Sequence, residues 1–263
     1  MTPELNVGIL LNELFVDTVR VSLPLFRPEL CLVATIVLLL LCRMLPLLRY
    51  LDSGGIALGG VCFAAWYAYV DFLSIGSQVG DSLLPATAVR TELFGGLLVF
   101  DSFTAFLRLV LAGFLVLYVV LTKLSGIPDR EDGADFYSLV LGSSLGMCLM
   151  VSANNLLIVF MAVEMASVPS YALAGMLKGR PASSEAALKY AIYGAGAAGV
   201  MLYGISLISG VLGTLVLPDV SFEMSRVLAA GGTSGSTMVL CLGGLMLSVG
   251  LAFKLSAVPF HFW

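Results

Sequence analysis

Three ionisable residues lie within long apolar stretches of this sequence. Glu164 follows Val-Phe-Met-Ala-Val, Lys189 follows Ala-Ala-Leu, and Lys254 follows Gly-Leu-Ala-Phe. A charge at the centre of a membrane costs on the order of a few kcal/mol, so each of these residues must be paired, hydrated or neutralised. Ionisable residues inside a membrane are candidate functional groups. We therefore expect these three residues to bind or move charge.

The pairing of these residues has two interpretations. We expect Glu164 and Lys189 to interact across adjacent helices, because a buried carboxylate needs a cation nearby. Such a pair can also be purely structural. Lys189 lies close to the start of its predicted helix, so its ammonium group can alternatively extend to the membrane surface. Both alternatives stay open at this point.

A proline follows two of the charges at the same spacing. Glu164 precedes Pro169 by five residues, and Lys254 precedes Pro259 by five. A proline inside a helix removes one backbone hydrogen bond, and the freed carbonyl then lies beside the charge. Because a buried lysine changes its pKa readily, Lys254 is the strongest candidate for a group that loads and releases a proton. Proline kinks also occur for packing alone.

Three further polar residues have weaker interpretations. His261 follows Lys254 by seven residues and is either a proton shuttle or a polar group at the membrane surface. Arg108, early in its predicted helix, either extends to the surface or pairs with a nearby acid. Asp71 is predicted to end its helix in contact with solvent.

The composition places most of the chain in a membrane. Hydrophobic residues make up 59% of the 263 residues and charged residues 11%, whereas soluble domains carry about 25% charge. A spanning helix needs roughly 20 apolar residues. Seven such segments are predicted: 29–48, 54–73, 101–124, 136–153, 155–177, 184–212 and 236–262. The fold class is therefore an all-α, polytopic transmembrane bundle with a break in its seventh helix.

Between and before these spans lie segments of different character. Residues 1–28 are predicted to form an interfacial segment, because they mix apolar and charged residues and end at Pro28. They do not resemble a cleavable signal peptide, which has a basic start and a short apolar core. Residues 213–236 form a polar, glycine-rich stretch.

Several function classes are disfavoured. The net charge is −4 and no basic tract is present, so nothing indicates nucleic-acid binding. Five cysteines and one histidine occur without a CxxC pair, which disfavours metal and redox sites.

Three motifs resemble the N-type subunit of respiratory complex I (NuoN in bacteria). They are Ser-Ala-Asn-Asn-Leu-Leu-Ile-Val-Phe-Met-Ala-Val-Glu-Met-Ala-Ser-Val-Pro-Ser-Tyr at 152–171, Ser-Glu-Ala-Ala-Leu-Lys-Tyr at 184–190, and Phe-Lys-Leu-Ser-Ala-Val-Pro-Phe-His-Phe-Trp at 253–263. The resemblance extends over about 95–263. It implies an antiporter-like subunit of the membrane arm. Glu164, Lys189, Lys254 and His261 then form a proton-translocating axis.

The resemblance also implies partners and cofactors. The chain would carry no redox centre, and NADH, FMN, iron–sulfur clusters and quinone would reside on other complex I subunits. Relatives continue beyond the position of Trp263, so the chain is expected to be a fragment or the product of a split gene or a partial open reading frame, and a partner chain would be needed to supply the missing C-terminal half. The expected division is 1–28 as interfacial segment, 29–124 as the first three helices, and 136–263 as the first part of the antiporter-like repeat.

Two alternatives remain. A subunit of a cation/proton antiporter or of a membrane-bound hydrogenase would share the fold, and a structural scaffold would have inert ion pairs. The expected location is the bacterial inner membrane, with the mitochondrial inner membrane and the thylakoid as alternatives.

Overall fold

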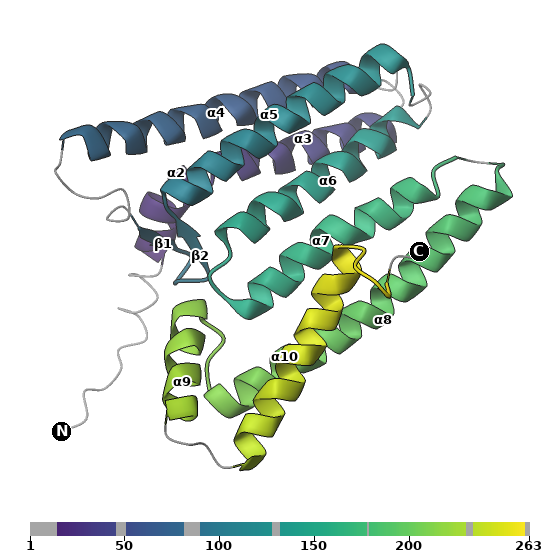
Figure 1. Cartoon of the computed structure of the whole chain (residues 1–263). Coiled ribbons are helices and arrows are strands. Elements are labelled where there is room, and N and C mark those ends of the chain that lie inside the picture. The colour runs from purple at the N-terminus through teal and green to yellow at the C-terminus, as the bar shows by residue number, and fades with distance from the viewer. Residues whose placement is uncertain are drawn as a thin grey trace. The chain divides into compact units, whose positions relative to one another are not determined.

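The computed structural model describes residues 15–45, 51–81, 90–127, 132–177, 179–229 and 234–260. The chain forms two compact units, Met1–Ser152 and Ala153–Trp263. In each unit, long helices provide almost all of the regular structure (Figure 1).

Within the described residues, six helices are long and apolar enough to cross a membrane. They are Ser53–Ile75, Ser102–Ser125, Gly133–Ser152, Leu156–Ala174, Pro181–Leu212 and Gly235–Lys254. Phe15–Leu25 and Arg27–Met44 add a seventh if the pair is one span, bent by 81°. The predicted polytopic helix bundle is thus confirmed, and the protein is an integral membrane protein.

The first unit is a bundle of four long helices. Its helical elements are a π-helical turn η1 (Thr18–Ser22), α2 (Leu23–Leu25), α3 (Arg27–Met44), α4 (Ser53–Asp81), α5 (Ser102–Ser125) and α6 (Gly133–Ser152). Helix α4 packs against α3 and α5, and α6 also packs against both of them. Helix α5 begins after Asp101, whose side chain accepts a hydrogen bond from the Thr104 N–H at 2.7 Å. The structure thus groups α6 with the three earlier spans.

A short β-hairpin precedes α5. Strand β1 (Thr91–Leu93) pairs antiparallel with β2 (Leu98–Phe100). Every residue of β2 is buried, and the Phe94 N–H donates to Ser22 Oγ at 3.0 Å. The all-helical prediction missed this hairpin, because two strands of three residues are too short to produce a recognisable alternation.

Asp71 corrects a prediction about the second span. Helix α4 does not end at this residue but continues to Asp81, and Asp71 is only 9% exposed. The predicted contact with solvent is therefore wrong, because the side chain lies inside the helix bundle of the first unit.

Gly60 allows α3 and α4 to approach each other closely. A Cβ atom at Gly60 would lie 2.0 Å from Thr35 Oγ1 and 2.7 Å from Thr35 Cβ, so rotation of the threonine alone cannot relieve the clash. We expect Gly60→Ala to destabilise the protein by about 1–3 kcal/mol, as overpacking usually does. Thermal unfolding of the purified chain in detergent measures this effect.

The neighbouring Gly59 provides a matched control in the same helix. A Cβ at Gly59 would meet nothing within 4 Å. Gly59→Ala is therefore expected to leave stability unchanged or to raise it slightly, because alanine favours the helix over glycine by about 1 kcal/mol. Equal unfolding temperatures for the two variants would contradict the close α3–α4 packing.

The second unit contains α7 (Leu156–Ala174), α8 (Pro181–Leu212), α9 (Leu217–Ala229) and α10 (Ser234–Lys254). Helix α8 packs against both α7 and α10, and Figure 1 shows α10 lying along α8. Their backbones approach closely at Gly204, where a Cβ would lie 2.7 Å from the carbonyl oxygen of Gly243. Small residues at such contacts let membrane helices pack tightly.

Helix α9 lies within the stretch predicted only as polar and glycine-rich. Its apolar residues Leu217, Val220, Met224 and Val227 recur at helical spacing and pack against a buried cluster that includes Met201. The high glycine and serine content around it concealed this short amphipathic helix. The long predicted loop is therefore partly helical.

Candidate functional site

One face of α7 carries three polar side chains. Glu164, Ser167 and Tyr171 follow one another at spacings of three and four residues, which places them on the same side of a helix. The helix begins at Asn155, whose side chain accepts a hydrogen bond from the Leu157 N–H at 2.9 Å. It continues through Pro169, so this proline does not end α7.

Lys254 brings a positive charge to that face. Its Nζ lies 3.0 Å from Glu164 Oε1, and it donates hydrogen bonds to Ser167 Oγ at 2.6 Å and Tyr171 Oη at 3.1 Å. The lysine side chain is 18% exposed and that of the glutamate 21%. An ammonium group has three N–H donors, and three oxygens lie within reach of it. The side chains of α7 therefore provide this cation with one carboxylate counter-ion and two hydroxyl acceptors.

Lys254 is also the last residue of α10. Leu255 and the residues after it form turns, in which the Ala257 N–H donates to the Ala252 carbonyl at 2.9 Å. A cation at a helix C-terminus is stabilised by the partial negative charge of the last carbonyls. The span was predicted to run to residue 262 with a break, and in the described residues its helix ends at the charged residue itself.

Aromatic rings from α7 and α10 lie beside the lysine, whose Nζ is 5.6 Å from the ring centroids of both Tyr171 and Phe253. The ring centroids of Tyr171 and Tyr190 lie 4.4 Å apart in an edge contact, and Tyr190 lies 6.2 Å from Phe253. Gly194 on α8 makes room for Tyr171, because a Cβ there would lie 2.2 Å from Tyr171 Oη. Packing of the tyrosine thus determines where its hydroxyl meets the lysine.

The predicted pair of Glu164 and Lys189 is wrong. Lys189 instead contacts Glu185, one turn earlier in α8, at 2.5 Å. Both side chains are more than half exposed, which fits the alternative that Lys189 extends to the surface. Glu164 pairs with Lys254, which is more distant in sequence. His261 lies outside the described residues.

Tyr171 is a member of this site that the sequence reasoning did not assign a role. A signal for it was present, because residues seven apart on a helix share a face. Ser167 and Tyr171 lie three and seven residues after Glu164, and both are polar side chains in a mostly apolar helix.

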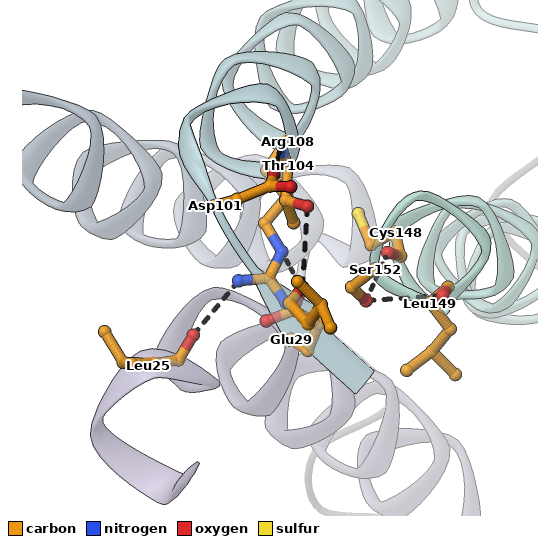
Figure 2. Close-up of polar contacts among 9 residues, drawn as sticks. Leu25, Glu29, Asp101, Thr104, Arg108, Cys148, Leu149 and Ser152 are labelled. Atoms are coloured by element: carbon orange, nitrogen blue, oxygen red, sulfur yellow. Dashed lines mark hydrogen bonds and ion pairs between the residues drawn. The ribbon is translucent and has the colours of Figure 1, made fainter. Parts of the chain in front are cut away.

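A second buried ion pair lies in the first unit. Arg108 Nε on α5 is 2.7 Å from Glu29 Oε1 on α3, with side chains 2% and 0% exposed. Arg108 Nη1 also donates to the Leu25 carbonyl at 3.1 Å, as Figure 2 shows. Of the two interpretations of Arg108, pairing with an acid is confirmed. Glu29 was missed because it lies at the start of its helix, where a carboxylate is usually read as solvated.

Comparison with known proteins matches the part of the chain that contains Glu164 and Lys254. Residues 153–263 match the family NADH:quinone oxidoreductase/Mrp antiporter, transmembrane region. NADH-quinone oxidoreductase subunit N 2 of Symbiobacterium thermophilum is 39% identical over 79% of this chain and 41% of its own length. The protein of the same name from Sorangium cellulosum is 35% identical over 92% of this chain and 46% of its own length.

Solved structures show the same likeness. A chain of respiratory complex I from Thermus thermophilus aligns with a TM-score of 0.64 and 29% identity, over 90% of this chain and 45% of that one. A chain of the archaeal membrane-bound sulfane sulfur reductase aligns with a TM-score of 0.66 at 21% identity, over 89% of this chain and 46% of that one. The second likeness concerns the fold alone.

The matched residues 153–263 contain the motifs at 184–190 and 253–263 and all but the first residue of the motif at 152–171. The chain spans less than half the length of the curated relatives that it matches. It belongs to the NADH-quinone oxidoreductase subunit N family.

Proposed function

We propose that this chain is part of a proton-translocating membrane-arm subunit of NADH-quinone oxidoreductase, in which quinone reduction is coupled to proton movement. The observation that carries this proposal is the contact of Lys254 with Glu164 at 3.0 Å, at the end of a spanning helix. A partly buried lysine whose counter-ion is a single carboxylate responds to a change in the charge of that carboxylate.

The surroundings of Lys254 suit both of its protonation states. While Glu164 is ionised, the ammonium group is stabilised by the carboxylate and by the hydroxyls of Ser167 and Tyr171. When the charge on Glu164 is compensated by another group, the lysine Nζ loses its counter-ion and releases a proton. A hydroxyl can donate as well as accept, so Tyr171 can then donate to the neutral amine. The site therefore needs no rearrangement of the backbone to change charge.

Electron transfer is assigned to other subunits in this proposal. In this proposal NADH, FMN, the iron–sulfur clusters and quinone bind to partner subunits, as the resemblance to the N-type subunit implies. The remainder of the antiporter-like architecture would come from further polypeptide or from a second chain. The relatives are bacterial proteins, which supports a bacterial inner membrane.

Removal of this chain from cells tests the proposal. Inner-membrane vesicles with and without it are supplied with NADH, and acidification and NADH:quinone turnover are recorded together. We expect NADH-driven acidification to be lost in its absence and to return when the chain is supplied again. Unchanged acidification and turnover would contradict the proposal.

The alternative of a cation/proton antiporter subunit predicts a different result in the same vesicles. A chain of the Mrp complex from Dietzia aligns with a TM-score of 0.58, but at 19% identity it supports only the fold. If the chain served such an antiporter, its removal would abolish sodium-dependent collapse of a pH gradient and leave NADH-driven acidification intact.

Gly194 provides a test of the position of Tyr171. We expect Gly194→Ala to reduce NADH-driven proton pumping by about ten- to a hundredfold, because the new methyl group displaces the tyrosine hydroxyl from Lys254 and small displacements in such sites are costly. Gly196→Ala is the matched control, since a Cβ there would meet nothing within 4 Å. Equal pumping by the two variants would show that the position of the Tyr171 hydroxyl does not matter for proton pumping.

A further inference from the structure

Three ionisable side chains from three different helices are buried in the first unit. Glu29 on α3 is 0% exposed, Arg108 on α5 is 2% exposed, and Asp71 on α4 is 9% exposed. The proton movement proposed for Lys254 uses none of them. Isolated charges in such an environment are costly, so their number and pairing require an explanation.

The cluster contains two carboxyl groups and one buried cation. Arg108 contacts Glu29 directly at 2.7 Å (Figure 2). The strongest electrostatic attraction on Asp71 comes from Arg108, and the next strongest comes from Arg27. Arg27 is exposed, with its guanidinium 6.0 Å from the ring centroid of Tyr67, so solvent weakens its effect on a buried group. Arg108 can neutralise only one of the two carboxyl groups.

Each of the three side chains has a buried polar atom without a hydrogen-bond partner among the described residues. These atoms are Glu29 Oε2, Asp71 Oδ2 and Arg108 Nη2. Leaving a buried polar atom unpaired costs about 1–3 kcal/mol, and more for a charged one. A proton on a carboxyl oxygen removes the charge, and burying a neutral carboxyl group costs much less than burying a carboxylate.

A small cavity lies beside the cluster. Its volume is about 20 Å³, and its lining includes Arg108, Pro28, Ala68 and Ser144. A space of this size has room for about one water molecule. Its walls are mostly apolar, so it does not hydrate the two carboxyl groups in the way that bulk solvent would.

We propose that Asp71 binds a proton in a buried site that Glu29 and Arg108 complete. Glu29 remains the anion that pairs with Arg108, and the proton resides on the unpartnered Oδ2 of Asp71. Among the described residues, Arg27, Cys31 and Cys148 also interact electrostatically with members of the cluster. This site is additional to Lys254, and it stands whether or not the proposed function is correct.

Infrared spectroscopy tests the proposal directly on the full chain in lipid nanodiscs. A protonated carboxyl group has a C=O stretching band that carboxylates lack and that shifts in D2O. At neutral pH the wild-type chain is expected to show such a band, and Asp71→Asn is expected to lose it. Asp52→Asn is the control, because Asp52 is exposed and paired with Lys123, and this variant should keep the band. A band that persists in Asp71→Asn overturns the proposal.

Isotope labelling gives a test without any substitution. In wild-type chain labelled with carbon-13 at the aspartate side-chain carboxyl, the band is expected to move to lower frequency, whereas a band from Glu164 or another glutamate would stay. The absence of a shift overturns the proposal even if Asp71→Asn fails to fold.

A further variant tests whether Glu29 and Asp71 compete for Arg108 as their counter-ion. Glu29→Gln removes the direct counter-ion of Arg108, so Arg108 is then free to neutralise Asp71. We expect this variant to lose the band although Asp71 is still present. A band that remains in Glu29→Gln contradicts the shared-cation part of the proposal. None of these measurements depends on NADH-driven activity, so their outcome is separate from that of the proposed function.

Discussion

Replacing Lys254 with alanine is expected to abolish NADH-driven proton pumping in vesicles that contain the complete complex. The substitution removes the only cation in contact with Glu164 among the described residues, together with the donor to Ser167 and Tyr171. Without an ionisable group at this position, no proton can be held or released there. NADH:quinone turnover, recorded in parallel, is expected to fall with pumping or to become uncoupled from it.

Lys254→Arg separates proton transfer from structure. A guanidinium keeps the positive charge and the pairing with Glu164, but it does not lose its proton in proteins. We expect Lys254→Arg to assemble normally and still not pump. Lys123→Ala is the matched control, because Lys123 is 42% exposed and pairs with the exposed Asp52. Full pumping by Lys254→Arg would show that Lys254 acts only as a fixed charge.

Much of the spanning architecture is predictable because a membrane imposes a simple requirement of length and apolarity. The boundaries of α5 follow from Asp101 as N-cap and from Gly126 in a left-handed conformation with φ 62° after its last turn. Helix α4 was predicted too short, because Asp71 was interpreted as a solvated end. A single charge does not end a span when a buried partner such as Arg108 is available.

The members of the candidate site were easier to predict than their partners. Glu164 and Lys254 are conspicuous because each is a charge in an apolar helix near a proline. Their contact joins residues 90 positions apart, and no local periodicity encodes such a contact (254 − 164 = 90). Lys189 was the nearer choice in sequence, but Glu185 one turn away provides a local partner, and such i,i+4 pairs form readily on an exposed helix face.

The same distinction applies to the two prolines at equal spacing. Pro169 lies within α7, which continues to Ala174, whereas α10 ends five residues before Pro259. The sequence predicted a freed carbonyl beside each charge but a break only in the seventh span, and in the described residues α7 continues through Pro169 while α10 ends at Lys254. Packing of the neighbouring helices decides whether the chain beyond a proline stays helical.

Removal of Arg108 is expected to cause the largest loss of stability among single substitutions in the first unit. Arg108→Ala leaves Glu29 buried without its counter-ion, and removing one partner of a buried ion pair typically costs about 3–5 kcal/mol. Unfolding of the purified chain in mixed detergent micelles at increasing denaturing-detergent concentration measures the difference. Arg43→Ala is the matched control, because Arg43 pairs with Asp135 at a position where the two side chains are 46% and 36% exposed. Exposed pairs contribute about 0–1 kcal/mol.

A double substitution then tests whether the buried pair of Glu29 and Arg108 is needed for stability. Replacing Glu29 and Arg108 together with leucine removes both charges, and such replacements of buried ion pairs are often neutral or stabilising. If Glu29→Leu with Arg108→Leu folds as stably as the wild type, stability alone does not explain the presence of the pair. A role in holding the charge state of Asp71 would then account for it. If the double variant is as unstable as Arg108→Ala, the pair is required for packing and its contribution to proton binding is secondary.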